Sequence, residues 1–358
     1  MIETMTYVGL DVHARSTDAA AIDVASGELR RARFGGGADE VVEWLRGLPQ
    51  PVRGCYEAGP TGFALYRAAE AAGLRVEVIA PSKTPRPSGD RVKTDRKDAE
   101  LLARLLLAGQ LKAVTVPPVA FEAARHLARA REQLRQDLMR CRHRVSKLLL
   151  LHGRVYDGSA WTKTHRRWLE RQRFDEPATE LAYLDALAAV DGLVARKAAL
   201  DERLSRLACE GEWWPTVARL RCFRGIDTLT ALVLCLEIGD FHRFRRPGQL
   251  AAWLGLVPSL NQSGASETRG PITKTGSSIA RRLLVEAARH YLPQPSVGVA
   301  LAQRRAGQPA EVLQVALRAQ RRLHRLYRRL RERGKPGNIT TVAVARELAC
   351  FLWAAAVV

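Results

Sequence analysis

Closely spaced cysteines are missing from this sequence. Its six cysteines are scattered along the chain with no C-x-x-C pair: Cys55, Cys141, Cys209, Cys222, Cys235 and Cys350. Zinc sites and disulfide frameworks both depend on cysteines at short, regular spacings, so the pattern argues against either. Dispersed free thiols are typical of a reducing compartment, and we expect a cytoplasmic protein.

Long hydrophobic runs are also missing. The longest apolar stretches, residues 232–236 and 348–358, fall well short of the roughly 20 apolar residues that span a bilayer as a helix. The first residues already follow a strand pattern and contain no basic-then-apolar leader. We therefore expect no membrane segment and no signal peptide.

Acidic residues are scarce relative to basic ones. The chain has 57 Lys and Arg against 37 Asp and Glu, a formal charge of +20 at pH 7. Such an excess favours a polyanionic partner, most commonly the phosphate backbone of a nucleic acid. A length of 358 residues allows two or three domains. The composition thus predicts a globular nucleic-acid-binding protein.

Some of the few acids gather at the start of one predicted helix. In residues 93–100, KTDRKDAE, Asp95 and Asp98 are three positions apart and so share one helix face. Their neighbours are basic: Arg91, Lys93, Arg96 and Lys97. Mg²⁺ prefers carboxylate ligands, so the pair is a candidate metal site. The alternative is that both acids only complement the positive end of the helix dipole.

The first part of the chain predicts a mixed α/β sheet. An antiparallel meander is followed by alternating strands and helices, which favours this class. The predicted strands are residues 6–11, 18–24, 28–34, 52–58 and 74–80. Asp11 ends the first strand and Glu57 lies near the end of the fourth, and side chains beyond neighbouring strand ends meet in such sheets. We expect both to converge with Asp95 and Asp98, where cations would neutralise the four carboxylates.

A helical, basic region follows the sheet. Apolar residues at alternating three- and four-residue steps predict a coiled-coil seam. They are Ala124, Leu127, Leu134, Leu138, Cys141, Val145 and Leu148 in residues 119–153, with one interruption at Arg131. A second helical pattern, in residues 180–207, consists of Leu181, Leu184, Leu187, Val194, Leu200, Leu204 and Leu207. The helices could pair within one chain or between subunits, and the apolar pattern is compatible with both arrangements.

The C-terminal part contains two motifs with possible chemistry. Residues 220–231, LRCFRGIDTLTA, resemble a helix-hairpin-helix motif that offers backbone N–H groups to phosphate, although a plain turn between helices fits as well. Residues 255–266 form a polar, serine-containing loop before a helix that begins near Ser277 or Ser278. An activated serine hydroxyl can attack a phosphodiester, whereas capping and turn formation are its ordinary roles.

Basic side chains near this loop and on a later helix are candidate nucleic-acid contacts. The helix spans residues 318–335, and its charge run is also consistent with a merely solvated face. The candidates are Arg269, Lys274, Arg281, Arg282, Arg321, Arg322, Arg325, Arg328 and Arg329.

Several motifs together resemble known families. Residues 7–11 (YVGLD), 56–62 (YEAGPTG) and 93–99 (KTDRKDA), in this order, resemble the ribonuclease-H-like fold of Holliday-junction resolvases. Residues 255–258 (GLVP), 262–264 (QSG), 269–276 (RGPITKTG) and 280–288 (ARRLLVEAA) closely resemble one family of insertion-sequence transposases. These join a resolvase-like acidic domain to a serine-bearing C-terminal domain and are described as bridge-RNA-guided recombinases. The resemblance covers essentially the whole chain.

The resemblance implies a three-part architecture: a ribonuclease-H-like α/β domain (1–112), a helical coiled-coil region for oligomerisation (113–215) and a mainly α transposase domain (216–358). It implies that Asp11, Glu57, Asp95 and Asp98 bind two Mg²⁺ ions. Ser263 matches the nucleophile of a Ser-Ser-Gly pattern whose first serine is Gln262 here, so Ser266 remains an alternative. The implied partners are donor and target DNA, a structured guide RNA and further copies of the chain, as a dimer or tetramer.

We therefore expect a DNA transposase or site-specific recombinase that uses these acids and Ser263. A metal-dependent endonuclease or junction resolvase without covalent serine chemistry is the alternative. A non-catalytic nucleic-acid-binding scaffold is a third hypothesis, in which only the basic residues would matter.

Overall fold

The structure, a computed structural model, describes residues 5–85, 94–263 and 266–358. The chain divides into two compact units, Met1–Pro117 and Pro118–Val358, and each is described by itself. Arg91 and Lys93, two of the basic residues near Asp95 and Asp98 in the sequence, lie outside the described residues.

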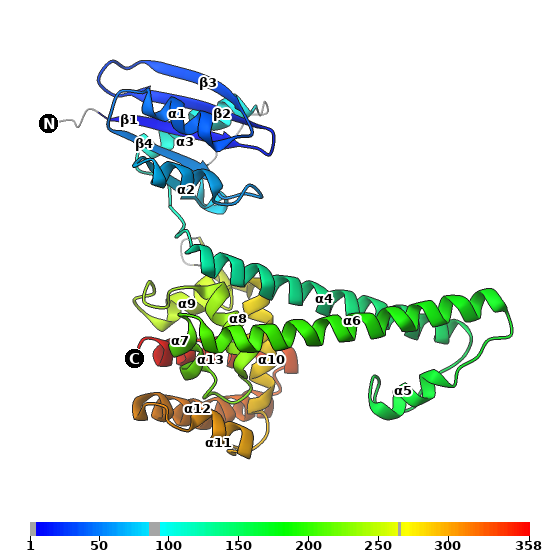
Figure 1. Ribbon diagram of the computed structural model, residues 1–358. Helices are drawn as coiled ribbons and strands as arrows, with labels where there is room; N and C mark the ends of the chain where they lie inside the picture. Colours follow the sequence, from blue (N-terminus) through cyan, green and yellow to red (C-terminus); the bar gives the residue numbers. More distant parts are fainter. Residues whose placement is uncertain (1–4, 86–93, 264–265) are drawn as a thin grey trace. The chain divides into compact units, whose positions relative to one another are not determined.

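The first unit is built on a five-stranded mixed sheet of order β3-β2-β1-β4-β5 (Figure 1). Strands β1, β2 and β3 form an antiparallel meander, whereas β4 and β5 run parallel to β1. The elements are β1 (Thr6–Val12), β2 (Ser16–Asp23), β3 (Leu29–Gly35), α1 (Ala38–Arg46), β4 (Val52–Glu57), α2 (Ala64–Ala71), β5 (Arg75–Ile79), η1 (Pro81–Lys83) and α3 (Asp95–Leu107). The predicted mixed sheet is confirmed, and its order is consistent with a ribonuclease-H-like domain.

The alternation of side chains along the strands assigns each face of this sheet to different helices. Val8 and Leu10 of β1 are buried in one hydrophobic cluster with Val41 of α1 and Leu65 of α2. Successive side chains of a strand point to opposite faces, so Gly9 and Asp11 face the other way, towards α3. The same alternation puts Tyr56 on the α1–α2 face and Glu57 on the α3 face.

The close approach of α3 to β1 depends on a glycine. A side-chain carbon at Gly9 would lie 2.5 Å from the backbone nitrogen of Ala103 and 2.8 Å from Cβ of Leu102, and would overlap the carbonyl oxygen of Ala99. These atoms belong to α3, so only a residue without a side chain lets this helix settle on the strand. The helix that carries Asp95 and Asp98 is thereby held against the strand that carries Asp11.

The second unit is helical except for one β-hairpin (Figure 1). Two long helices, α4 and α6, run side by side in opposite directions, with α5 in the connection between them. The elements are α4 (Val119–Leu151), α5 (Lys163–Glu170), α6 (Pro177–Glu210), α7 (Trp214–Leu220), α8 (Thr228–Ile238), α9 (Pro247–Trp253), β6 (Pro258–Ser263), β7 (Ser266–Ile272), α10 (Ser278–Ala288), η2 (Arg289–Tyr291), α11 (Val299–Arg305), α12 (Ala310–Glu332) and α13 (Gly337–Ala356).

The two long helices pair within this chain, and the buried face of α6 differs from the predicted seam. Leu138, Cys141 and Val145 of α4 are buried as expected. On α6, however, Tyr183, Leu187 and Val190 face the partner helix, while Leu181 and Leu184 are exposed. Leu187 and Leu204 of the predicted pattern are buried, so the pattern is right at these two positions and wrong at Leu181 and Leu184. Whether the pair is a true coiled coil remains a prediction.

The C-terminal core is organised around α8 and α13. Helix α13 is long and apolar enough to cross a membrane by length and composition. Its Val344, Leu348 and Leu352 are instead buried in the hydrophobic core of this unit, together with Leu232 of α8. In the predicted helix-hairpin-helix motif, a side chain at Gly225 would come within 2.7 Å of the carbonyl oxygen of Ala287 in α10. This glycine is thus required by helix packing.

The predicted serine loop proved to be a β-hairpin. Strands β6 and β7 pair antiparallel, and all six residues of β6 are exposed. A fully exposed ribbon has no alternation of apolar and polar residues, which is the signal that identifies strands in a sequence. The expectation of a loop over residues 255–266 was therefore wrong for Pro258–Ser263 and Ser266.

Replacing Gly9 with alanine should lower the free energy of unfolding of the first unit by about 1–3 kcal/mol or more, because α3 must move away from β1. Gly37→Ala is the matched control, since its added carbon meets no atom within 4 Å and its φ of −78° suits alanine. Urea denaturation measures both. Equal stability of the two variants would contradict the proposed close contact.

Candidate active site

Three ligand-type side chains meet at the end of β1. Nε2 of His13 lies 3.1 Å from Oδ2 of Asp11 and 3.7 Å from Oδ1 of Asp95. Ligand atoms from all three residues lie within 4.8 Å of one another, close enough to share one metal ion. Asp95 is the first residue of α3, and the side chain of Thr94 caps this helix by accepting a hydrogen bond from the backbone N–H of Lys97.

The electrostatics of Asp11 fit a cation site. Partial burial raises the pKa of Asp11, and the interaction with His13 offsets this only in part. The negative charges of Asp95 and Asp98 raise the pKa of Asp11 further. A carboxylate that is both desolvated and repelled by its neighbours is stabilised by a positive charge, and a divalent ion supplies it.

Only part of the predicted four-acid set is gathered in this cluster. Asp98 lies one turn into α3 and acts on Asp11 through its charge. Glu57 is the last residue of β4, the parallel neighbour of β1, on the same side of the sheet as Asp11. Neither belongs to the three-residue group whose ligand atoms are within 4.8 Å. Asp11 and Asp95 are thus the acids that the structure brings together.

His13 is a member of this cluster that we did not place among the candidate catalytic residues. Its position two residues after Asp11, just beyond the strand end, was a usable signal, because it lies where functional side chains collect. A single exposed histidine is so common that this position alone was not decisive. Imidazole nitrogen and carboxylate oxygen are both metal ligands, so the chemistry of this donor set fits a divalent ion.

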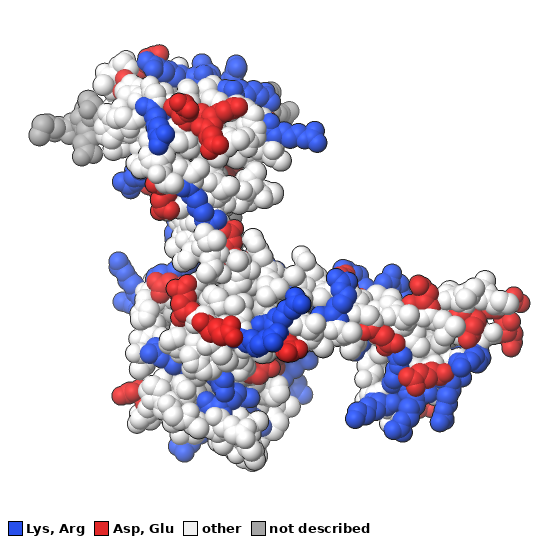
Figure 2. Space-filling view, viewed as in Figure 1, with Lys and Arg blue, Asp and Glu red and all other residues white. Residues whose placement is uncertain are grey.

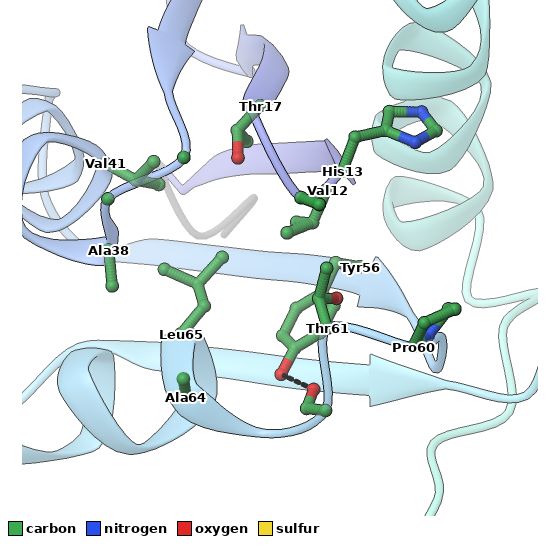
Figure 3. Close-up of a pocket in the computed structure, with 14 residues that line it drawn as sticks. Val12, His13, Thr17, Ala38, Val41, Tyr56, Pro60, Thr61, Ala64 and Leu65 are labelled. Carbon is green, nitrogen blue, oxygen red and sulfur yellow. Dashed lines mark hydrogen bonds between the residues drawn. The ribbon is translucent and has the colours of Figure 1, made fainter.

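A cavity of about 340 Å³ lies at the same edge of the sheet but on its other face (Figure 3). Val12, Val41, Tyr56 and Leu65 line it, and its lining includes no Asp or Glu. The Tyr56 hydroxyl donates a hydrogen bond of 3.1 Å to the carbonyl oxygen of Gly62. Figure 3 shows the ring of His13 turned away from the cavity. His13 belongs to the cavity lining as well as to the acidic cluster, so the two features adjoin at the end of β1.

The predicted nucleophile lies at the end of the exposed hairpin. Ser263 is the last residue of β6 and pairs with Ser266, the first residue of β7. Both serines are exposed, and the residues between them, including Gly264 of the quoted motif, lie outside the described residues. The hairpin thus presents two hydroxyl groups at one place. Arg269 of β7 forms an ion pair of 2.9 Å with Glu267 on the same strand.

The base of the hairpin is fixed tightly to the end of α9. A side chain at Gly255, whose φ is +66°, would approach the carbonyl oxygen of Thr275 to 2.6 Å. Lys274 itself adopts a left-handed backbone with φ of 55°. Arg281 of α10 donates hydrogen bonds to the carbonyl oxygens of Leu254 and Thr275, at 2.8 and 2.7 Å. Through these two hydrogen bonds, Arg281 fixes the backbone on both sides of the hairpin base.

Buried ion pairs support α10 from beneath. Glu237 of α8 accepts hydrogen bonds from Nε of Arg129 at 2.8 Å and from the hydroxyl of Ser277, the N-cap of α10, also at 2.8 Å. Arg282, another candidate contact, forms ion pairs with Glu132 at 2.6 Å and Glu286 at 2.7 Å. The guanidinium group of Arg282 is thus committed to linking α4 and α10.

The other candidate contacts form a basic face on α12. Its opposite face is buried through Val315, Ala319 and Leu323, so the arginines point outward. Arg322 pairs with Glu347 and Arg328 pairs with Glu332. No ion pair within the described ranges involves the other exposed arginines of the set: Arg321, Arg325 and Arg329.

Replacing Asp11 with asparagine should raise the melting temperature of the metal-free protein by a few degrees, because burial and repulsion of a charge are removed. Adding Mg²⁺ should stabilise the native protein, by about 2.7 kcal/mol at 100 times the dissociation constant, and stabilise the variant much less. Asp39→Asn, an exposed acid of α1, is the control. Equal stabilisation of all three proteins in thermal unfolding would exclude a metal site at Asp11.

Replacing Glu237 with glutamine should lower the free energy of unfolding by about 1–3 kcal/mol at pH 7, because a buried charged acceptor is lost. Burial raises the pKa of Glu237, but hydrogen bonds from Arg129 and Ser277 and the positive charges of Arg129 and Arg125 together lower it more, so the net shift is downward. The stabilisation is therefore present above the ordinary value of 4.5 and fades as pH falls below it.

Urea denaturation at several pH values measures this difference, with Glu202→Gln, an exposed acid of α6, as the control. A stability difference that stays constant down to pH 3.5 would show that the charge of Glu237 is not the cause.

Comparison with known proteins identifies the chain. Residues 8–153 match a transposase model of the DEDD type of IS110 elements, and residues 217–296 match the model described as transposase IS116/IS110/IS902 family. A protein of Sinorhizobium fredii named as a transposase, y4qE, is 39% identical over 98% of this chain and 88% of its own length. The transposase for insertion sequence element IS1533 of Leptospira borgpetersenii is 32% identical over 92% of this chain and 97% of its own length.

The transposase for insertion sequence element IS1328 of Yersinia enterocolitica is 26% identical over 80% of this chain and 84% of its own length. The matches to the family models cover both units, and the relatives extend over nearly the whole chain. The chain therefore belongs to the IS110/IS116/IS902 family of transposases, enzymes of DNA transposition.

Proposed function

We propose that this transposase cuts and rejoins DNA with Asp11, Glu57, Asp95 and Asp98 as its Mg²⁺-binding acids and Ser263 as its nucleophile. The single observation that carries the proposal is the cluster of Asp11, His13 and Asp95, whose ligand atoms lie within 4.8 Å of one another. It lies in the part of the chain that matches the DEDD-type transposase model. We propose three functional parts: a ribonuclease-H-like catalytic domain (1–112), a helical oligomerisation region (113–215) and a transposase domain with the serine (216–358). The proposed location is the cytoplasm.

The acids have the task of holding cations beside the scissile phosphate. When bound, Mg²⁺ neutralises phosphate charge and stabilises the attacking and leaving oxygens, and a pair of ions does so on both sides. Asp11 and Asp95 supply ligands from β1 and α3. Asp98 and Glu57, on the same side of the sheet, would complete the set. His13 orients Asp11 through their contact of 3.1 Å.

The hydroxyl of Ser263 would carry out the covalent step. Its oxygen forms a bond to phosphorus, the bond from phosphorus to one deoxyribose oxygen breaks, and this oxygen takes up a proton while the serine proton passes to a base. The phosphodiester energy is kept in the phosphoserine bond. Attack on that bond by the hydroxyl group of another DNA end then releases the serine and joins the strands.

The exposure of the hairpin supports a site completed by another subunit. Isolated two-stranded ribbons are only marginally stable in water, yet all residues of β6 are exposed in this chain. Packing of the hairpin against DNA and the acidic domain of a second copy would provide the missing contacts. A dimer or tetramer with a structured guide RNA is the assembly that we propose.

The basic residues would hold the nucleic acids. Arg321, Arg325 and Arg329 lie four residues apart on α12 and therefore form one outward row. Phosphate contacts of this kind position DNA without reading its sequence. Arg269 belongs to β7 of the serine hairpin and Lys274 follows it, and both would contact the strand being cut.

An endonuclease or junction resolvase is the second candidate. The acidic cluster lies entirely in the first unit, so hydrolysis with water as the nucleophile would need no serine. Loss of Ser263 would then leave cleavage intact.

Ser263→Ala should abolish both the covalent protein–DNA adduct and the recombinant product, with at least a thousandfold loss of strand exchange. Purified protein would be incubated with Mg²⁺, labelled donor and target DNA and the element-derived RNA, then analysed on denaturing gels. Ser266→Ala is the matched control across the hairpin and should retain the adduct. Asp11→Ala should lose all cleavage. Cleavage without an adduct in the native protein would favour the hydrolytic alternative.

A further inference from the structure

Helix α5 lies at the end of the α4–α6 pair that points away from the helical core of the second unit (Figure 1). Glu132 of α4, through its ion pair with Arg282 of α10, marks the region where α4 leaves that core. From there to its end at Leu151, α4 rises by about 28 Å at 1.5 Å per residue. The pair thus holds α5 well away from the core.

The inner face of α5 is anchored by a small core of its own. His165 and Leu169 are buried, and Leu169 accepts a hydrogen bond of 2.6 Å from the hydroxyl of Tyr183 in α6. Rings of Tyr156, Trp161 and Trp168 surround His165 at centroid distances of 4.6, 5.4 and 5.7 Å. The aromatic rings therefore pack against His165, and these contacts and the Tyr183 hydrogen bond fix the orientation of α5.

The outer face of α5 carries a row of free cations. Lys163 and Arg167 of α5 and Arg171, its C-cap residue, are spaced by four residues, so they lie on one side of the helix, each about 6 Å further along the axis. All three are exposed, and none of them takes part in an ion pair within the described ranges. Arg166, on the flank, is instead paired with Asp191 at 2.7 Å.

Positive charge is concentrated around this row. Residues 140–174 contain ten Lys and Arg but only two Asp and Glu. Figure 2 shows basic side chains gathered where α5 lies, next to acidic side chains at the end of the helical pair. Like charges four residues apart destabilise a helix by a few tenths of a kcal/mol per pair. A rigid row of this kind has no partner within the described chain and is suited to an external polyanion.

We propose that the outward face of α5 is a separate DNA-contact surface that binds the phosphate backbone of duplex DNA. Single-stranded nucleic acid is usually held by stacking bases on open aromatic rings, and the rings here are packed around His165. A straight row of cations suits the regular backbone of a duplex. The length of the projecting helical pair places this contact about eight base pairs along the DNA from the core of the second unit, at 3.4 Å per pair.

The test uses the full chain, without Mg²⁺, on a duplex of arbitrary sequence about 50 base pairs long, because phosphate contacts need no specific sequence. The variant is Lys163→Gln/Arg167→Gln/Arg171→Gln. The matched control is Arg196→Gln/Arg203→Gln/Arg206→Gln, three exposed arginines of α6. Affinity is measured between 50 and 200 mM salt, and hydroxyl-radical footprints record the protected length.

Three lost phosphate contacts should reduce the slope of log affinity against log salt by about 2.7. Over this fourfold change in salt, the native protein and the control should then lose about 40-fold more affinity than the variant. The footprint of the variant should be shorter at one end. Lys163→Arg/Arg167→Lys/Arg171→Lys, which keeps the charge, should behave like the native protein.

An unchanged slope and footprint would overturn the proposal, as would an equal loss in the α6 control. A loss confined to binding of a structured RNA hairpin, with DNA binding intact, would overturn it in favour of an RNA contact. Because no cleavage is measured, these outcomes are independent of whether Ser263 is the nucleophile.

Discussion

The close contact between α3 and β1 is the constraint on which the candidate active site depends. Without a side chain at Gly9, the backbone of α3 reaches the strand, and the first residue of the helix, Asp95, comes next to Asp11. Two carboxylates and His13 are thereby assembled from segments more than eighty residues apart in the chain. Partial burial and, to a smaller extent, the negative charges of Asp95 and Asp98 raise the pKa of Asp11, and burial of the apolar face of α3 offsets this cost.

In the second unit, an exposed serine hairpin is held at its base by contacts with the helices on either side. Tight backbone contacts at Gly255 and the two hydrogen bonds from Arg281 hold its base. Beneath it, Glu237 joins α4, α8 and the cap of α10 through Arg129 and Ser277. Exposed serines on a hairpin whose base is held by these contacts are consistent with the nucleophile role that we propose for Ser263.

Much of the architecture could be predicted because it depends on local patterns. The strands and helices of the first unit, the Asp95–Asp98 helix start and the helix after Ser277 all follow from apolar periodicity and capping residues. The β6–β7 hairpin could not be predicted in this way, because none of its residues in β6 is buried. The buried face of α6 was predicted only in part: Leu187 and Leu204 are buried, whereas Leu181 and Leu184 are exposed, because apolar residues occupy more than one side of that helix.

Sequence alone determined the order of the elements, the excess of positive charge and the motifs that place the chain among transposases. Only the tertiary structure decided which charged residues act together. It placed His13 with Asp11 and Asp95, and it committed Arg281 and Arg282 to internal contacts. It left Lys163, Arg167 and Arg171 without an ion pair among the described residues. The reason is physical: charge and periodicity are properties of neighbouring residues, whereas burial and ion pairing depend on which distant segments pack against one another.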